Sequence, residues 1–81
     1  MKIKVLFFAQ LREAFGTGET LIEVNEGSSV GEAVESIFNA SSLSHLKGLP
    51  LLYSVNEDFA EADQTLRAED ALALLPPVAG G

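Results

Sequence analysis

The sequence has no cysteine and only one histidine among its 81 residues. Without cysteine, disulfides cannot reinforce the core, and thiolate zinc sites and thiol nucleophiles are excluded. The single histidine, His45, lies in a serine-rich polar stretch. We interpret it as a surface residue rather than a metal ligand or part of a Ser-His relay.

Basic residues are also scarce, with 5 Lys and Arg against 12 Asp and Glu, so the formal net charge is −7 and the pI is about 4.4. No basic patch is available to neutralise phosphates, so nucleic acid and anionic membranes are excluded as partners. A basic protein surface is the favoured partner, because complementary charge speeds encounter.

Long apolar runs are missing as well. The longest uninterrupted apolar stretches are 5–9 and 71–75, far short of the about 20 residues that span a bilayer. The start imitates a signal peptide, but its apolar part is too short and is interrupted by Gln10 and Arg12. We therefore expect no membrane partner and a cytoplasmic location, with which the lack of cysteine is compatible.

Two other patterns favour ordinary structure over chemistry. Gly16 and Gly18 form a G-x-G without the third glycine and helix start of a phosphate-binding loop, so we interpret them as a hairpin turn. Four acids lack the calcium-loop spacing D-x-D-x-D-G and are interpreted as a solvated loop: Glu57, Asp58, Glu61 and Asp63. Neither pattern supports a bound cofactor or a metal.

Hydrophobic alternation and turn residues predict the order strand, strand, helix, strand, strand. Strands are expected at 2–9, 19–24, 51–56 and 71–75, with a helical turn at 10–15, a tight turn at 57–58, a strand stub at 59–60 and a turn region at 65–70. The helix is predicted to start with a capping box of Ser29 and Glu32 and to end near 39 or 40. Its apolar stripe is Val30, Ala33, Val34, Ile37 and Phe38.

These elements predict an α+β fold, in which a mostly antiparallel sheet carries one main helix across one face. A single helix covers only one face of a sheet, so the other face is expected to meet water or a partner. We expect 1–75 to form the domain and 76–81 to form a flexible tail.

The tail is narrow and stiff at its root, with the sequence Pro76, Pro77, Val78, Ala79, Gly80 and Gly81. Prolines lower the ordering cost of threading into another protein, and glycines let a tunnel close around the backbone. The reactive group is then the Gly81 carboxylate, a poor acyl donor that must be activated, most simply as an acyl-adenylate from ATP. Because the chain has no phosphate-binding motif, this step needs a nucleotide-binding partner.

Three stretches together resemble the family of small, sulfur-carrier subunits of molybdopterin synthase over essentially the whole chain. They are VLFFAQLRE at 5–13 with Gly16, Val55-Asn56 before an acidic turn, and the ending LLPPVAGG. The resemblance implies a ubiquitin-like β-grasp fold. It implies that Gly81 is adenylated by a ubiquitin-activating-type enzyme with ATP and converted to a thiocarboxylate. Two sulfur transfers to cyclic pyranopterin monophosphate, inside the large subunit, then build the molybdopterin dithiolene.

The same resemblance implies a heterotetramer of two small and two large subunits. Catalytic acids and bases are then expected on the large subunit, and this chain is a non-catalytic sulfur donor. Two positions depart from the family pattern. Leu74 and Leu75 stand where aromatic residues often precede Pro-Pro, and Ala68-Glu69-Asp70 replaces Asp-Gly-Asp. Without a glycine to adopt a left-handed conformation, this turn is expected to differ in type.

Phe8 and Leu75 are predicted to lie on the sheet face away from the helix, because their parity is opposite to that of Phe7 and Leu74. There we expect them to contact the large subunit; the alternative is that both belong to the core. Arg12 either pairs with acids of the partner or is solvated.

Three other functions remain open from the sequence. The chain could be the thiazole-forming sulfur carrier of thiamin synthesis, a ubiquitin-like modifier whose Gly81 forms amide bonds with lysines, or a binding module with an inert tail. The Phe-Phe-Ala-Gln-Leu-Arg-Glu head favours the molybdenum pathway.

Overall fold

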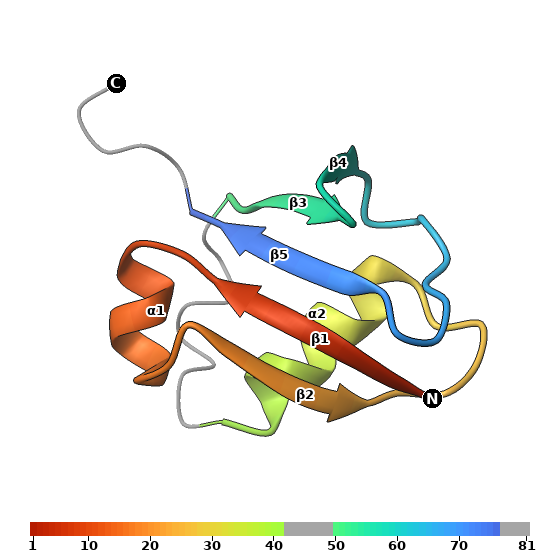
Figure 1. The fold of residues 1–81 in the computed structure, drawn as a ribbon, viewed down its shortest axis with the longest axis horizontal. Helices are drawn as coiled ribbons and strands as arrows, with labels where there is room; N and C mark the ends of the chain where they lie inside the picture. Colours follow the sequence, from red (N-terminus) through yellow and green to blue (C-terminus); the bar gives the residue numbers. More distant parts are fainter. Residues whose placement is uncertain (42–49, 77–81) are drawn as a thin grey trace.

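A computed structural model describes residues 1–41 and 50–76, and its strands form one five-stranded sheet in the order β2-β1-β5-β3-β4 (Figure 1). In chain order the elements are β1 (Lys2–Phe7), α1 (Gln10–Phe15), β2 (Glu19–Glu23), α2 (Val30–Asn39), β3 (Leu52–Val55), β4 (Asp58–Ala60) and β5 (Ala71–Leu75). Helix α2 crosses one face of the sheet, as Figure 1 shows. The predicted α+β architecture is therefore confirmed.

The first and the last strand of the chain, β1 and β5, lie side by side in the middle of the sheet. Strand β5 pairs in parallel with β1 and antiparallel with β3, whereas β2 and β4 each pair antiparallel with one neighbour. The sheet is thus mixed and mostly antiparallel, as the resemblance implied. In this register Phe7 lies beside Leu74, and Leu52 lies beside Leu75.

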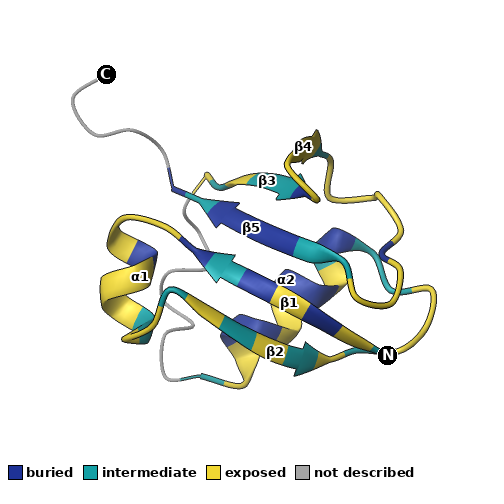
Figure 2. Ribbon diagram, viewed as in Figure 1, coloured by how far each residue is buried: buried dark blue, intermediate teal, exposed yellow. Residues whose placement is uncertain are grey.

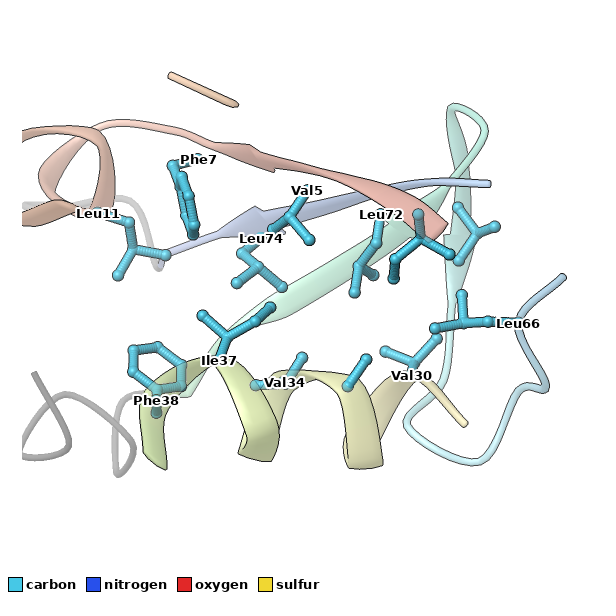
Figure 3. Close-up of a cluster of buried hydrophobic side chains, with 13 residues drawn as sticks. Val5, Phe7, Leu11, Val30, Val34, Ile37, Phe38, Leu66, Leu72 and Leu74 are labelled. Atoms are coloured by element: carbon cyan, nitrogen blue, oxygen red, sulfur yellow. The ribbon is translucent and has the colours of Figure 1, made fainter. Parts of the chain in front are cut away.

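The N-terminus of α2 is fixed by the predicted capping box. The Ser29 Oγ accepts a hydrogen bond from the Glu32 backbone N–H at 3.2 Å, and the Glu32 Oε1 accepts one from the Ser29 N–H at 2.9 Å. Ordinarily such caps satisfy backbone donors that a helix cannot pair internally. The predicted apolar stripe of α2 is buried against the sheet (Figure 3): Val30, Ala33, Val34, Ile37 and Phe38.

One core residue comes from a segment that was expected to be only a turn. Leu66 is 2% exposed and packs with the core beside Val30, as Figure 3 shows. Its N–H donates to the Ser28 carbonyl at 2.8 Å, and the preceding Thr65 forms an isolated bridge with Ser29. The segment before β5 is therefore tied to the start of α2.

Two turns differ from the sequence-based expectation. The turn between β3 and β4 is Asn56-Glu57 rather than 57–58, because Asp58 already belongs to β4. Both turn residues have positive φ, 52° and 74°, which is typical of a two-residue type I′ hairpin. Gly16 is not part of a hairpin turn; it ends α1 as a left-handed C-cap with φ 75°.

The chain also leaves β1 earlier than predicted. The strand ends at Phe7 instead of 9, since Ala9 has a φ of 52° and the Leu11 N–H donates to the Phe8 carbonyl at 3.1 Å. This turn starts α1, which buries Leu11. The predicted helical turn at 10–15 is confirmed.

The turn before β5 contains a residue in the left-handed conformation, although the turn has no glycine. Glu69 adopts a φ of 69°, and its N–H donates to the Lys2 carbonyl at 2.8 Å. The Asp70 carboxylate accepts from the Arg67 N–H at 2.8 Å and from the Asn56 Nδ2 at 2.9 Å. Because these bonds link the turn to β1 and to the β3–β4 hairpin, a glutamate is held in a conformation that usually favours glycine.

Candidate tail root and open sheet face

The structure describes part of the predicted site. Phe8, Arg12, Leu75 and Pro76 lie among the described residues. The remaining predicted site residues lie outside them: Pro77, Val78, Ala79, Gly80 and Gly81. His45, which was interpreted as a surface residue, also lies outside the described residues. The geometry of the site is therefore that of the root from which the C-terminal residues continue.

Strand β5 holds this root at the centre of the sheet. It lies between β1 and β3, and Leu72, Ala73 and Leu74 are buried along it. Pro76, directly after the strand, is buried too. Because the last strand pairs on both sides, the chain that follows Pro76 starts from a fixed point in the fold.

Phe8 and Leu75 lie next to this point and are not core residues. The parallel register places Phe7 beside Leu74, so the following residues, Phe8 and Leu75, stand level with each other. Phe7 and Leu74 are 2% and 0% exposed, whereas Phe8 is 45% exposed and Leu75 is half-buried. Leu75 is thus more accessible than Leu74 next to it on β5, and Phe8 is exposed just beyond the end of β1. Contact of Phe8 and Leu75 with a partner stays a prediction.

The sheet face opposite α2 carries further exposed apolar side chains, which we call the open face. Leu52 is 56% exposed beside Leu75, and Phe59 is 80% exposed in register with Ser54. Figure 2 shows how exposed residues alternate with less exposed ones along β1 and β2. Leu52 and Phe59 were not predicted as surface contacts, although the alternation of residues along 51–60, with a two-residue turn between the strands, indicates that they share a face.

Arg12 lies at the side of the root, on α1. Its side chain is exposed, and its carbonyl accepts from the Gly16 N–H at 3.0 Å. A Cβ at Gly18 would lie 3.4 Å from the Arg12 Nε, so the guanidinium end folds back over the start of β2. An exposed basic side chain is thereby placed over Gly18 in a chain whose net charge is −7.

Residues suited to catalysis or metal binding do not gather in the described part of the chain. Within 1–41 and 50–76, no three His, Asp or Glu side chains are placed to hold a metal ion. The four acids interpreted as a solvated loop are exposed: Glu57, Asp58, Glu61 and Asp63. Neither described helix is long and apolar enough to cross a membrane.

Comparison with known proteins places this geometry in a family. The model of the ThiS family matches residues 5–81. The molybdopterin synthase sulfur carrier subunit of Escherichia coli (strain K12) is 40% identical over 82 residues, covering 98% of this chain and 99% of that protein.

Solved structures show the same fold. SAMP1 from Haloferax volcanii matches with a TM-score of 0.87 at 25% identity, covering 100% of both chains. A chain from the protein–protein complex of subunits 1 and 2 of the molybdopterin-converting factor of Helicobacter pylori matches with a TM-score of 0.71 at 24% identity, again over 100% of both chains. The chain belongs to the ThiS family and has the ubiquitin-like β-grasp fold of the molybdopterin synthase sulfur carrier subunits.

Proposed function

We propose that this chain is the sulfur carrier subunit of a molybdopterin synthase, with the Gly81 carboxylate as the group that carries sulfur. The observation that carries the proposal is its 40% identity, over almost the full length of both proteins, to a subunit of that kind. The buried root at Pro76, at the end of a central strand, supports it, because the fold holds the start of the Gly-Gly ending in place.

The chemistry begins with activation of Gly81. Its carboxylate oxygen attacks the α-phosphate of ATP, which is held by a ubiquitin-activating-type enzyme, and pyrophosphate leaves. Hydrosulfide supplied by a sulfur donor then attacks the acyl carbon, and AMP leaves, so that sulfur replaces one carboxylate oxygen. The product is a thiocarboxylate, which is ionised at neutral pH and is a better nucleophile than the carboxylate.

The second half of the cycle takes place in the large subunit. The thiocarboxylate sulfur attacks a carbon of cyclic pyranopterin monophosphate that carries oxygen, and the bond from that carbon to its oxygen breaks, so that the oxygen leaves. Water then attacks the Gly81 acyl carbon, the bond between sulfur and that carbon breaks, and the carboxylate is regenerated. Two such transfers supply both sulfurs of the dithiolene. Acids and bases for these proton transfers belong to the large subunit, and this chain needs no cofactor of its own.

Reach and cross-section suit the last residues to this role. The segment 77–81 spans at most about 18 Å when extended, at roughly 3.3–3.6 Å per residue. This length lets Gly81 enter a site well below a partner's surface while the domain remains outside. Glycine at both final positions keeps the end narrow.

The open face is the surface that we assign to the large subunit. Phe8 and Leu75 adjoin the root, and Leu52 continues the apolar surface beside Leu75. Burying these side chains against a partner would hold the domain while the tail is inserted. The Helicobacter pylori neighbour is a complex of subunits 1 and 2, and a heterotetramer of two small and two large subunits is the assembly that we propose here.

Intact mass spectrometry tests the proposal directly. The chain is incubated with ATP, an activating enzyme and a sulfur donor, and we expect one oxygen-to-sulfur mass shift that fragmentation assigns to Gly81. Addition of the large subunit and cyclic pyranopterin monophosphate should reverse the shift and produce molybdopterin.

The matched control is the same chain with one residue appended after Gly81. This variant keeps the whole domain but buries the reactive end in an ordinary peptide bond, so neither the mass shift nor molybdopterin is expected. Unchanged molybdopterin production by the extended chain would overturn the proposal. Amide-linked, higher-mass conjugates on denaturing gels would instead support the modifier, and sulfur transfer to a thiazole would support the thiamin carrier.

A further inference from the structure

A second surface lies at the edge of the sheet formed by β2. Among the described strands, β2 pairs only with β1 and forms one edge of the sheet, whereas the root of the tail follows β5, on the far side of β1. An unpaired strand edge presents backbone donors and acceptors to which another extended chain can bond. Leu52 and Leu75, which are assigned above to the large subunit, lie on the other side of β1 from this edge.

The register of β1 and β2 identifies the backbone groups at this edge. Val24 and Met1 exchange backbone bonds, and the Phe7 N–H donates to the Gly18 carbonyl at 2.9 Å. In an antiparallel pair such bonds recur at every second residue, so 18, 20, 22 and 24 bond to β1. The N–H and C=O groups of Glu19, Leu21 and Glu23 therefore point away from β1.

One of these three residues already has a local partner. The Thr17 Oγ1 donates to the Glu19 carbonyl at 2.9 Å and accepts from the Glu19 N–H at 3.4 Å. The N–H and C=O groups of Leu21 and Glu23 therefore remain available at this edge. The outward N–H and C=O groups of Leu21 and Glu23 can hydrogen-bond to the backbone of an added strand and so fix its register.

Apolar surface lies on both sides of this edge. On the open face, the Leu21 side chain is 66% exposed. On the helix side, Thr20 and Ile22 border a groove of about 360 Å³ between β2, α1 and α2. Its other lining residues include Phe15, Ile37 and Ala40. An added strand would place alternate side chains in the groove and over Leu21.

Charge indicates which chain would fit. Glu19 and Glu23 are both exposed and lie on the same face as Leu21. In a second copy paired antiparallel about Leu21, Glu19 would face Glu23 of that copy, and in parallel pairing each glutamate would face itself. Like charges placed directly opposite destabilise a strand pair, so this edge disfavours self-association.

A basic segment, in contrast, would be attracted to this edge. On β1, Lys2 lies opposite Glu23, and the Lys4 Nζ lies 3.5 Å from the Glu19 carboxylate. Basic residues on an added strand would continue this alternation of lysine and glutamate rows across the sheet. The net charge of −7 favours the same kind of partner at longer range.

We propose that the β2 edge binds an extended segment of another protein with the pattern basic, apolar, apolar, apolar, basic. The two basic residues lie opposite Glu19 and Glu23, and the central residue covers Leu21. The other two apolar residues occupy the groove beside Thr20 and Ile22. Because β1 separates this edge from β5, the segment can be bound while the tail is engaged elsewhere.

A synthetic peptide tests the proposal with the full chain in solution. The probe is Gly-Ser-Lys-Val-Leu-Val-Arg-Ser-Gly, and the matched control has glutamate in place of lysine and arginine. In nitrogen-15 NMR titrations we expect the largest amide shifts at Leu21 and Glu23 and slower hydrogen exchange at Leu21. The control peptide should bind about tenfold more weakly, since two ion pairs become repulsive contacts.

Two variants separate edge pairing from general apolar contact. Leu21→Pro removes a donor that points away from β1, so the ladder of β1 and β2 keeps its bonds while binding of the peptide is lost. Leu21→Ala keeps the donor and should retain part of the affinity. The double variant Glu19→Lys, Glu23→Lys changes only exposed side chains and should prefer the acidic control peptide.

Three results would overturn the proposal. They are peptide shifts centred on Leu52, Phe59 and Leu75 instead of β2, undiminished binding by Leu21→Pro, and the same peptide preference in the double charge variant. Self-association through β2 would likewise contradict it. None of these results affects the Gly81 mass shift, so this proposal and the proposed function fail independently.

Discussion

The two faces of the sheet use similar residues in different ways. On the helix face, Val5, Leu72 and Leu74 are fully buried. On the open face, leucines of the same strands and their neighbours stay accessible: Leu21 is 66% exposed, Leu52 is 56% exposed, and Leu75 is half-buried. Residue type alone therefore does not decide whether a leucine is buried. The difference is that α2 covers one of them, and on the other apolar side chains remain free for contact.

Leu74 and Leu75 allow the sharpest test of this difference, because they are adjacent leucines on opposite faces. Leu74→Ala leaves a cavity under α2 and should lower the free energy of unfolding by about 3 kcal/mol. Leu75→Ala removes a half-buried side chain and should cost less than about 1 kcal/mol. Urea unfolding followed by circular dichroism measures both changes. Equal losses would mean that the open face contributes to the core as much as the helix face.

Phe7 and Phe8 extend the comparison from stability to binding. Phe8→Asp should leave the domain folded but reduce binding to the large subunit by about 2–4 kcal/mol, as expected for an aromatic residue central to an interface. Calorimetry with the purified large subunit measures the affinity.

The control for this change is Phe7→Asp, which places a charge beside Phe15, whose ring stacks on Phe7 with a centroid distance of 4.2 Å. A buried, unpaired charge should unfold the chain. If Phe8→Asp unfolded it as well, Phe8 would act as a core residue, and the open face would lose its proposed role.

Much of this division could be predicted from the sequence, because it depends on local periodicity. Alternation assigned Phe7 and Leu74 to one face and Leu75 to the other, and the spacing of Ser29 and Glu32 located the start of α2. A period of two residues in strands and of 3.6 in helices follows from backbone geometry alone. Such signals need no knowledge of what lies across the fold.

Features that depend on distant contacts could not be predicted in this way. Leu66 is buried only because its segment bonds to Ser28, far away in the sequence. The parallel pairing of β1 with β5 sets Phe8 level with Leu75, and no local pattern in either strand reveals it.

The start of α2 offers a smaller perturbation of the covered face. Ser29→Ala removes the acceptor for the Glu32 N–H and should lower the free energy of unfolding by about 1 kcal/mol. Ser29→Asp retains a capping oxygen and should restore most of that loss. Thermal unfolding compares the three proteins. A negligible effect of Ser29→Ala would show that packing against the sheet, rather than the cap, fixes where α2 begins.

The turn that leads into β5 provides the smallest expected effect, and one of opposite sign. Glu69 has a φ of 69°, a conformation that costs a residue with a side chain roughly 1–2 kcal/mol. Glu69→Gly removes this cost but adds backbone entropy to the unfolded chain, so a net stabilisation of about 0.5–1 kcal/mol is expected.

Ala68→Gly is the matched control, because Ala68 precedes Glu69 in the same turn without a positive φ. It should destabilise the chain by about 0.5–1 kcal/mol, the ordinary effect of added backbone freedom. Stabilisation by Glu69→Gly together with destabilisation by Ala68→Gly would show that the turn leading into β5 contains a strained residue. Destabilisation by both changes would instead assign Glu69 a side-chain role that outweighs its backbone strain.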